Sequence, residues 1–168
     1  MLKLGDPLEL DPAEVKFAVR GPEVLQLRDG DFKLTFKYEH PAIPKGQEQS
    51  FSFEKDTTTA LPQEITADLH TGEKAEIYAF TPDSIKKWRQ LQQEIQALKQ
   101  AGNPGKGAIS VSLASGCKTG PLPAGPLYVG VYTQTRKDQD FFELMPKMDL
   151  RPIMEAQGAK SEEIPDCN

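Results

Sequence analysis

Hydrophobic and polar residues alternate along several short runs of the chain, which is the pattern of β-strands with one buried face. The clearest run covers 31–38, and its apolar residues on one face are Phe32, Leu34, Phe36 and Tyr38. A second alternating run, 24–28, precedes it, and Asp29-Gly30 lies between the two. Because Asp-Gly favours the positive φ angles of a type I′ turn, these two runs are expected to form a β-hairpin.

Similar alternation predicts further strands at 14–20, 50–54, 64–69, 75–79, 108–114, 127–133 and 141–145. The runs 64–69 and 75–79 flank Thr71-Gly72 and are expected to pair as a second hairpin. Alternation indicates strands that are buried on one face only. It therefore favours antiparallel pairing over a parallel sheet, whose strands are apolar throughout.

A spacing of three and four residues predicts one long amphipathic helix that begins after Thr81. Thr81 can cap the first turn, and Pro82 suits the first helical position. The apolar stripe of this helix consists of Ile85, Trp88, Leu91, Ile95 and Leu98. Gly102 and Pro104 are expected to end the helix, and a second, short helix is expected over 149–157.

Together these elements predict a mainly β protein of the α+β class. We expect an antiparallel β-sandwich or a curved sheet, with the long amphipathic helix packed on it. The 168 residues suit a single β-rich domain, 1–168, and no run of about 20 apolar residues suggests a transmembrane helix. Trp88 is expected in the core. A helix packed loosely on the sheet would instead let Trp88 line a cleft for an apolar ligand.

The charge and the motifs exclude several classes of function. A formal net charge of −5 argues against nucleic-acid binding. The chain has two histidines, His40 and His70, and no Cys-x-x-Cys pair, so no metal site is expected. No glycine-rich segment has the spacing of a phosphate-binding loop, and no cofactor is expected.

Two cysteines, Cys117 and Cys167, allow one disulfide, which would tie the tail 158–168 to the body of the protein. Closing that loop would stabilise the fold by about 4 kcal/mol in the chain-entropy model, and it would indicate an oxidising compartment. The alternative is two free thiols in a reducing cytosol. Lys118 would then lower the pKa of Cys117, and His40 or His70 could act as its base.

Five residues are candidate contacts for a ligand or a partner: Trp88, Leu122, Pro123, Tyr128 and Tyr132. Leu122 and Pro123 belong to the proline-rich segment 120–126, and a stiff apolar loop of this kind can form a recognition surface. The simpler interpretation is a rigid connection between two strands. Tyr128 and Tyr132 alternate with Leu127, Val129 and Val131 along the strand expected to follow.

The first quarter of the chain resembles the start of uncharacterised bacterial envelope lipoproteins. The resemblance rests on Leu10-Asp11-Pro12-Ala13-Glu14-Val15, on Ala18-Val19-Arg20-Gly21-Pro22, and on the segment 25–30 that follows. In that family the stretch follows a lipid-modified cysteine. No such cysteine stands near the start of this chain, so the resemblance implies that Met1 replaces a removed signal and anchor. The family supplies no catalytic residues.

These observations favour a non-enzymatic domain of the bacterial envelope, periplasmic or at the outer envelope. It would bind a protein partner, or an apolar ligand between the helix and the sheet, and it would reach a membrane only through an anchor outside this chain. One alternative is a cytoplasmic enzyme or regulatory domain with a site centred on Cys117. Another is an accessory subunit that docks a larger assembly through a sheet edge or through 120–126.

Overall fold

The computed structural model describes residues 6–102, 105–113, 116–160 and 163–168. Seven strands form one antiparallel sheet: β1 (Lys16–Pro22), β3 (Phe32–His40), β4 (Ile43–Lys55), β5 (Glu73–Phe80), β6 (Lys106–Leu113), β8 (Tyr128–Gln134) and β9 (Phe142–Asp149). Their order across the sheet is β6-β3-β4-β5-β1-β8-β9. Two short strands, β2 (Leu25–Gln26) and β7 (Cys117–Lys118), pair separately. The helices are α1 (Gln63–Asp68), α2 (Pro82–Gln100) and α3 (Leu150–Ala156).

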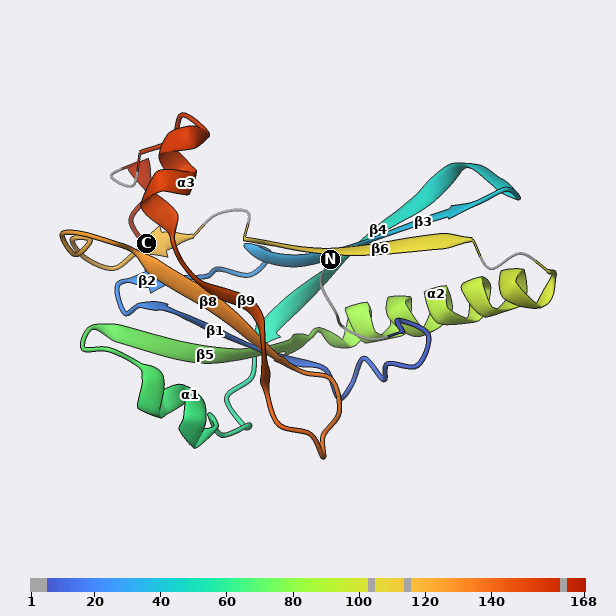
Figure 1. Ribbon diagram of the computed structural model, residues 1–168, viewed down its shortest axis with the longest axis horizontal. Helices are drawn as coiled ribbons and strands as arrows, with labels where there is room; N and C mark the ends of the chain where they lie inside the picture. Colours follow the sequence, from blue (N-terminus) through green and yellow to red (C-terminus); the bar gives the residue numbers. More distant parts are fainter. Residues whose placement is uncertain (1–5, 103–104, 114–115, 161–162) are drawn as a thin grey trace.

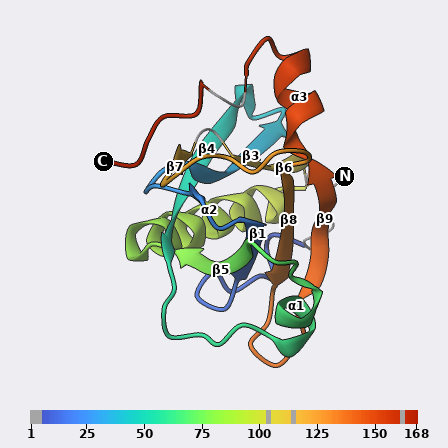
Figure 2. The ribbon, with the colours of Figure 1, turned by 90° about the vertical axis from the view of Figure 1, so that its left-hand side faces the viewer.

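The sheet is curled, and the long helix α2 lies on its inner face (Figure 1). Figure 2 shows the curl around α2, with β3 and β4 above the helix and β1 and β5 below it. The structure thus confirms the mainly β class, the curved antiparallel sheet and the packed helix. It also shows why the helix begins where the sequence predicts, because the Ser84 amide donates to the Thr81 side chain at 3.1 Å.

Trp88 lies in the aromatic core between α2 and the sheet, and only 2% of it is exposed. Its ring centroid is 4.9 Å from that of Phe51, 5.6 Å from Phe80 and 6.1 Å from Phe36. Phe36 belongs to the predicted face of 31–38, whose four apolar residues are all buried. The helix is therefore packed tightly on the sheet, and Trp88 lines no cleft there.

The predicted hairpin between 24–28 and 31–38 is wrong. A tight turn does form, since Gly30 has a φ of 87° and the Asp31 amide donates to the Arg28 carbonyl at 3.0 Å. It is not the predicted type I′ turn, because Asp29 does not have a positive φ. However, β4 and β6 occupy both edges of β3, so 24–28 has no edge to pair with, and β2 pairs with β7 instead. β3 instead forms a hairpin with the strand that follows it, β4, and its other edge pairs with the distant strand β6.

The predicted strand 64–69, and with it the second hairpin, is also wrong, because this segment contains the helix α1. Ile65 and Leu69 are four residues apart, and residues at this spacing lie on the same face in a helix as well as in a strand. They pack on the outer face of the sheet, against Ala18 and Ile77. The predicted run 75–79 does lie in β5. The run 108–114 corresponds to β6, although Ala114 lies outside the described residues.

Arg20 fixes α1 to this outer face of the sheet, and its side chain is completely buried. Its guanidinium pairs with the Asp68 carboxylate, donates to the Asp68 carbonyl at 2.9 Å, and pairs with Glu73 at 3.0 Å. The Tyr132 hydroxyl lies 3.4 Å from the same group. Burial alone would lower the pKa of Arg20, but the hydrogen bonds with Tyr132, Glu73 and Asp68 outweigh it and raise the pKa.

Replacing Trp88 tests the core. We expect Trp88→Ala to lower the free energy of unfolding by about 3–5 kcal/mol, because it removes the largest ring of the aromatic cluster and leaves a cavity. Chemical denaturation followed by circular dichroism measures this loss. Lys86→Ala on the exposed side of the same helix is the control and should change stability by less than about 0.5 kcal/mol. Equal effects of the two substitutions would contradict the packing described here.

Replacing Arg20 tests the buried ion pairs. We expect Arg20→Met to destabilise the protein by about 3–5 kcal/mol, because Glu73, with a side chain only 10% exposed, would be left without its cation. Arg136→Met, at an exposed position, serves as the control in the same denaturation experiment. A variant Arg20→Met as stable as the unmodified protein would show that these charges do not hold α1 in place.

Candidate functional site

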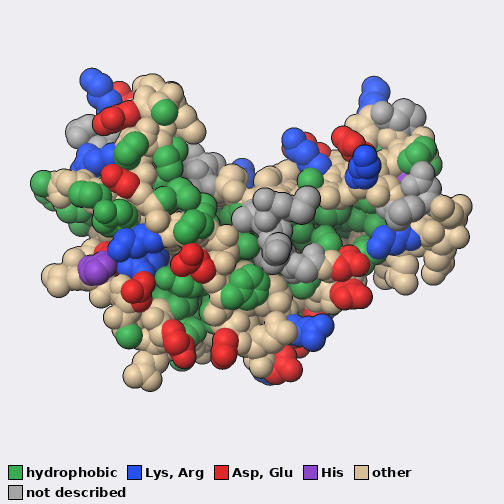
Figure 3. Space-filling model, viewed as in Figure 1, with side chains coloured by type: hydrophobic (Ala, Val, Ile, Leu, Met, Phe, Trp, Pro, Cys, Tyr) green, Lys and Arg blue, Asp and Glu red, His purple; other side chains and the backbone are tan. Residues whose placement is uncertain are grey.

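A cleft of about 390 Å³ opens on the inner face of the sheet, at the start of β5 and away from α2. Its floor is formed by Val19 and Gly21 of β1, Tyr78 of β5 and Val129 of β8. The two walls are a β2 wall, comprising Leu25, Gln26, Leu27 and Gly116, and an α3 wall, comprising Leu150, Ile153, Met154, Gln157, Ala159 and Ile164. Figure 3 shows hydrophobic side chains gathered around the base of α3. The cleft thus lies between the sheet and a helix, but under α3 and not under α2.

The absence of a side chain at Gly21 leaves space at the floor of the cleft. A Cβ atom at this position would lie 3.3 Å from Cγ1 of Val129, on the neighbouring strand. Gly21 follows Val19 at a spacing of two residues on β1, so its missing side chain would have pointed into the cleft. The absence of that side chain leaves the space that Val19 and Val129 border.

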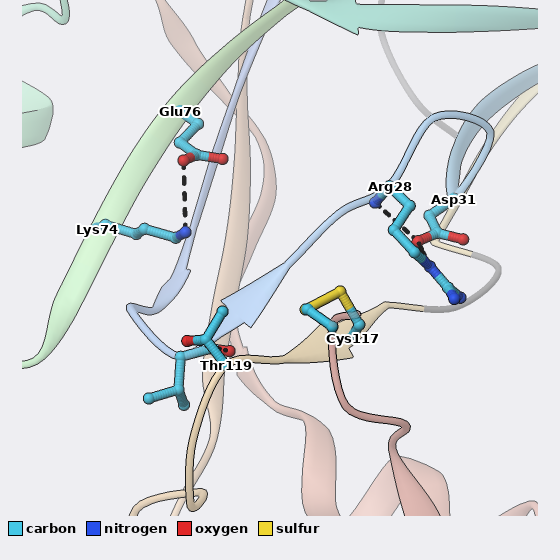
Figure 4. The surroundings of a disulfide bond; sticks show 8 residues. Arg28, Asp31, Lys74, Glu76, Cys117 and Thr119 are labelled. Carbon is cyan, nitrogen blue, oxygen red and sulfur yellow. Dashed lines mark hydrogen bonds and ion pairs between the residues drawn. A yellow bond between two sulfur atoms is a disulfide. The ribbon is translucent and has the colours of Figure 1, made fainter.

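Charged residues gather at one end of the cleft, on β5. Lys74, Glu76 and Tyr78 are two residues apart from one another and therefore share the inner face of this strand. Glu76 Oε1 lies 3.4 Å from the Lys74 ammonium and 3.1 Å from that of Lys55 on β4, while Tyr78 donates to Oε2 at 3.0 Å. Figure 4 shows Lys74 and Glu76 projecting from β5 on the side that faces β2 and the disulfide.

These contacts set the protonation states at the charged end. Burial alone would raise the pKa of Glu76, but hydrogen bonds from Lys55 and Tyr78 and the charge of Lys74 hold the pKa below its ordinary value. Burial, together with the nearby Glu76 charge, raises the pKa of Tyr78. At neutral pH the site therefore presents the Glu76 carboxylate and a neutral Tyr78 phenol.

The C-terminal tail forms part of the α3 wall and is attached through Cys117 and Cys167. These cysteines form a disulfide with a Cα–Cα distance of 4.9 Å, which confirms the predicted pairing (Figure 4). Backbone bonds reinforce it: the Lys118 amide donates to the Pro165 carbonyl, and the Cys167 amide donates to the Lys118 carbonyl, both at 2.8 Å. The attached tail places Ile164 at the cleft. Residues 161–162 of the predicted tail lie outside the described part.

The five candidate contacts from the sequence do not form one site. Leu122 and Pro123 lie in a shallow hollow of the 120–126 loop, where Arg151 donates to the Pro123 carbonyl at 2.7 Å. Pro123 also borders a second hollow with Tyr128, which is 39% exposed and has the Lys147 ammonium 4.5 Å from its ring centroid. Tyr132 lies on the outer face beside Arg20, and Trp88 is in the core.

Sequence reasoning missed the cleft residues because Val19 and Val129 alternate as ordinary core residues do. One signal could have drawn attention to the cleft: Lys74 and Glu76 continue the inner face that Tyr78 and Phe80 occupy in β5. Charged residues at the buried positions of a strand indicate that the apolar layer ends there or opens to a polar site.

Other chemistry receives little support from the described residues. The Cys117 sulfur is bonded to Cys167 and is not a free thiol. His40 accepts a hydrogen bond from the Ala42 amide at 3.0 Å, and His70 lies 3.1 Å from the Lys147 ammonium. Within the described ranges, no three His, Cys, Asp or Glu side chains are grouped so that they could hold a metal ion. None of the described helices has the length and apolar character needed to span a membrane.

Comparison with known proteins adds no relative. No model of a known protein family matches the chain, and no curated protein and no solved structure matches it.

The disulfide is tested by replacing both cysteines. We expect Cys117→Ser/Cys167→Ser to lower the free energy of unfolding by about 4 kcal/mol, the chain-entropy value for a loop of this length. Hydrogen exchange at the amides of Lys118 and Cys167 should also become faster, because the tail is no longer attached. The unmodified protein in dithiothreitol is the matched control and should behave in the same way. Unchanged stability and exchange would show that the backbone bonds alone hold the tail.

Proposed function

We propose that this protein is a non-enzymatic binding module of the bacterial cell envelope and that its cleft binds an apolar ligand. The observation that carries the proposal is the cleft itself, which joins an apolar floor and walls to a small charged group at one end. Concave apolar sites with a few convergent polar groups are the usual form of small-molecule sites. The cleft volume falls within the range of about 300–1,000 Å³ typical of such sites.

The proposed location rests on the disulfide. Disulfides persist in oxidising compartments and are rare in the reducing cytosol, so the bond between Cys117 and Cys167 favours an extracytoplasmic protein. The same bond weakens the alternative hypothesis of a cytoplasmic enzyme, because that hypothesis requires Cys117 to act as a free thiolate nucleophile. The resemblance of residues 10–30 to envelope lipoproteins is consistent with this location.

A second candidate function, the binding of a protein partner, is favoured by the hollow around Tyr128. This exposed ring is bordered by Pro22, Pro123 and Pro126. Exposed aromatic residues beside prolines are frequent contacts in protein interfaces. The hollow is shallow, however, and Tyr128 already carries the Lys147 ammonium over its ring, so the cleft is the stronger site.

A neutral apolar fluorophore, N-phenylnaphthylamine, tests the proposed function. We expect a saturable rise in its fluorescence with the unmodified protein. Ile153→Glu should weaken binding by at least about tenfold, because it places a carboxylate on the apolar α3 wall. Phe142→Glu is a matched control, since Phe142 has the same exposed fraction, 39%, but does not line the cleft. Absence of saturable binding, or equal binding by both variants, would contradict the proposal.

A further inference from the structure

We propose that the ligand is a single-chain amphiphile with an anionic head group, a carboxylate or a phosphate monoester, and that Lys74 binds this head group. This inference rests on the proposed function, since it specifies the ligand of the same cleft. It is carried by an imbalance of hydrogen-bonding groups at the charged end and by the shape of the apolar part.

The charged end has more donors than its own carboxylate uses. Lys74 and Lys55 each carry three N–H donors, and among the described residues each makes a single contact, in both cases with Glu76 Oε1. Tyr78 donates its only hydroxyl proton to Oε2 of Glu76. Two ammonium groups therefore share one carboxylate oxygen, which leaves most of their N–H donors for another acceptor. The complementary head group is an anion with several acceptor oxygens.

Lys74, and not Lys55, is placed to contact a ligand. Lys74 lines the cleft beside Glu76 and Tyr78, whereas Lys55 reaches Glu76 from β4 outside the cleft. The Lys74 side chain is 26% exposed, so its charge is only partly screened by water. Toward the disulfide side of the cleft, Arg28 and Asp31 form an ion pair with each other at 3.1 Å. The charges of Asp29 and Asp31 both act on Tyr78.

The remaining cleft fits one apolar chain. Beyond Lys74 the floor runs over Val19, Gly21 and Val129, and the walls on both sides are mainly aliphatic. The volume of about 390 Å³ lies near the lower limit for ligand sites, which favours a single chain over a two-chain lipid. A head group on Lys74 directs such a chain along the floor under Ile153 and Met154.

Displacement of N-phenylnaphthylamine by amphiphiles of equal chain length tests the inference. The competitors are dodecanoate, dodecyl phosphate, dodecanol and dodecyltrimethylammonium, each below its aggregation concentration. With the unmodified protein, at least one anion should displace the probe at a concentration about tenfold lower than dodecanol, and the cation should be the weakest competitor. The comparison of the two anions shows whether a carboxylate or a phosphate is preferred.

Two variants separate contact from general electrostatics. Lys74→Gln should abolish the advantage of the anions while leaving the affinity for dodecanol unchanged. Lys55→Gln removes one of the two ammonium groups on the same carboxylate but does not alter the cleft lining. The advantage of the anions should therefore fall, but by less than in Lys74→Gln, because Lys74 still contacts the head group. Circular dichroism of both variants checks that the fold is retained.

The outcomes distinguish the two proposals. If the probe binds but anions and alcohol displace it equally, or if Lys55→Gln and Lys74→Gln have equal effects, the head-group inference is overturned and the binding function stands. If the unmodified protein does not bind the neutral probe at all, and dodecanoate and dodecyl phosphate give no heat of binding in calorimetry, both proposals fail.

Discussion

The fold depends on covering one apolar sheet face that extends beyond the helix packed on it. Phe17 marks its centre: it is fully buried on β1 and packs edge-on against Phe32 and Phe53. On one side of Phe17 the aromatic residues of the sheet meet α2 and form the main hydrophobic core. On the other side, Val19 and Val129 continue the same face where α2 no longer reaches. Apolar surface of this kind must be buried by other segments if the sheet is to be stable.

The segments that cover the second half are too small to hold their own positions. Helix α3 has seven residues, and helices of this length are not stable alone in water. The strands β2 and β7 have two residues each, and the tail beyond Gly158 is polar. The disulfide solves this problem because it joins the tail to β7, which in turn pairs with β2. These short elements cover the sheet face less completely than one long helix would. The cleft is the space that they leave uncovered.

Prediction from the sequence succeeded where the deciding interactions are local. The α2 cap at Thr81 and the alternation of Phe32 to Tyr38 can be identified from neighbouring residues alone. The hairpin at Asp29-Gly30 failed because the following strand β4 and the distant strand β6 occupy the two edges of β3. α1 was missed because its six residues bury only Ile65. The cleft could not be predicted, since nothing local tells a valine that borders a space from one that contacts another side chain.

The charges on β5 contribute little to stability, and the proposed binding function would give them a role. Lys74 and Glu76 occupy inward positions of a strand whose next inward residues, Tyr78 and Phe80, are buried. Apolar residues there would extend the core at no cost in desolvation. Partly exposed ion pairs of this kind contribute on the order of 0–1 kcal/mol to the stability of the fold. This contribution is too small to explain why charged residues interrupt an apolar face. In the proposed complex, the anionic head group of the ligand would pair with the cation at the end of the cleft. The apolar chain of the same ligand would cover the floor and walls.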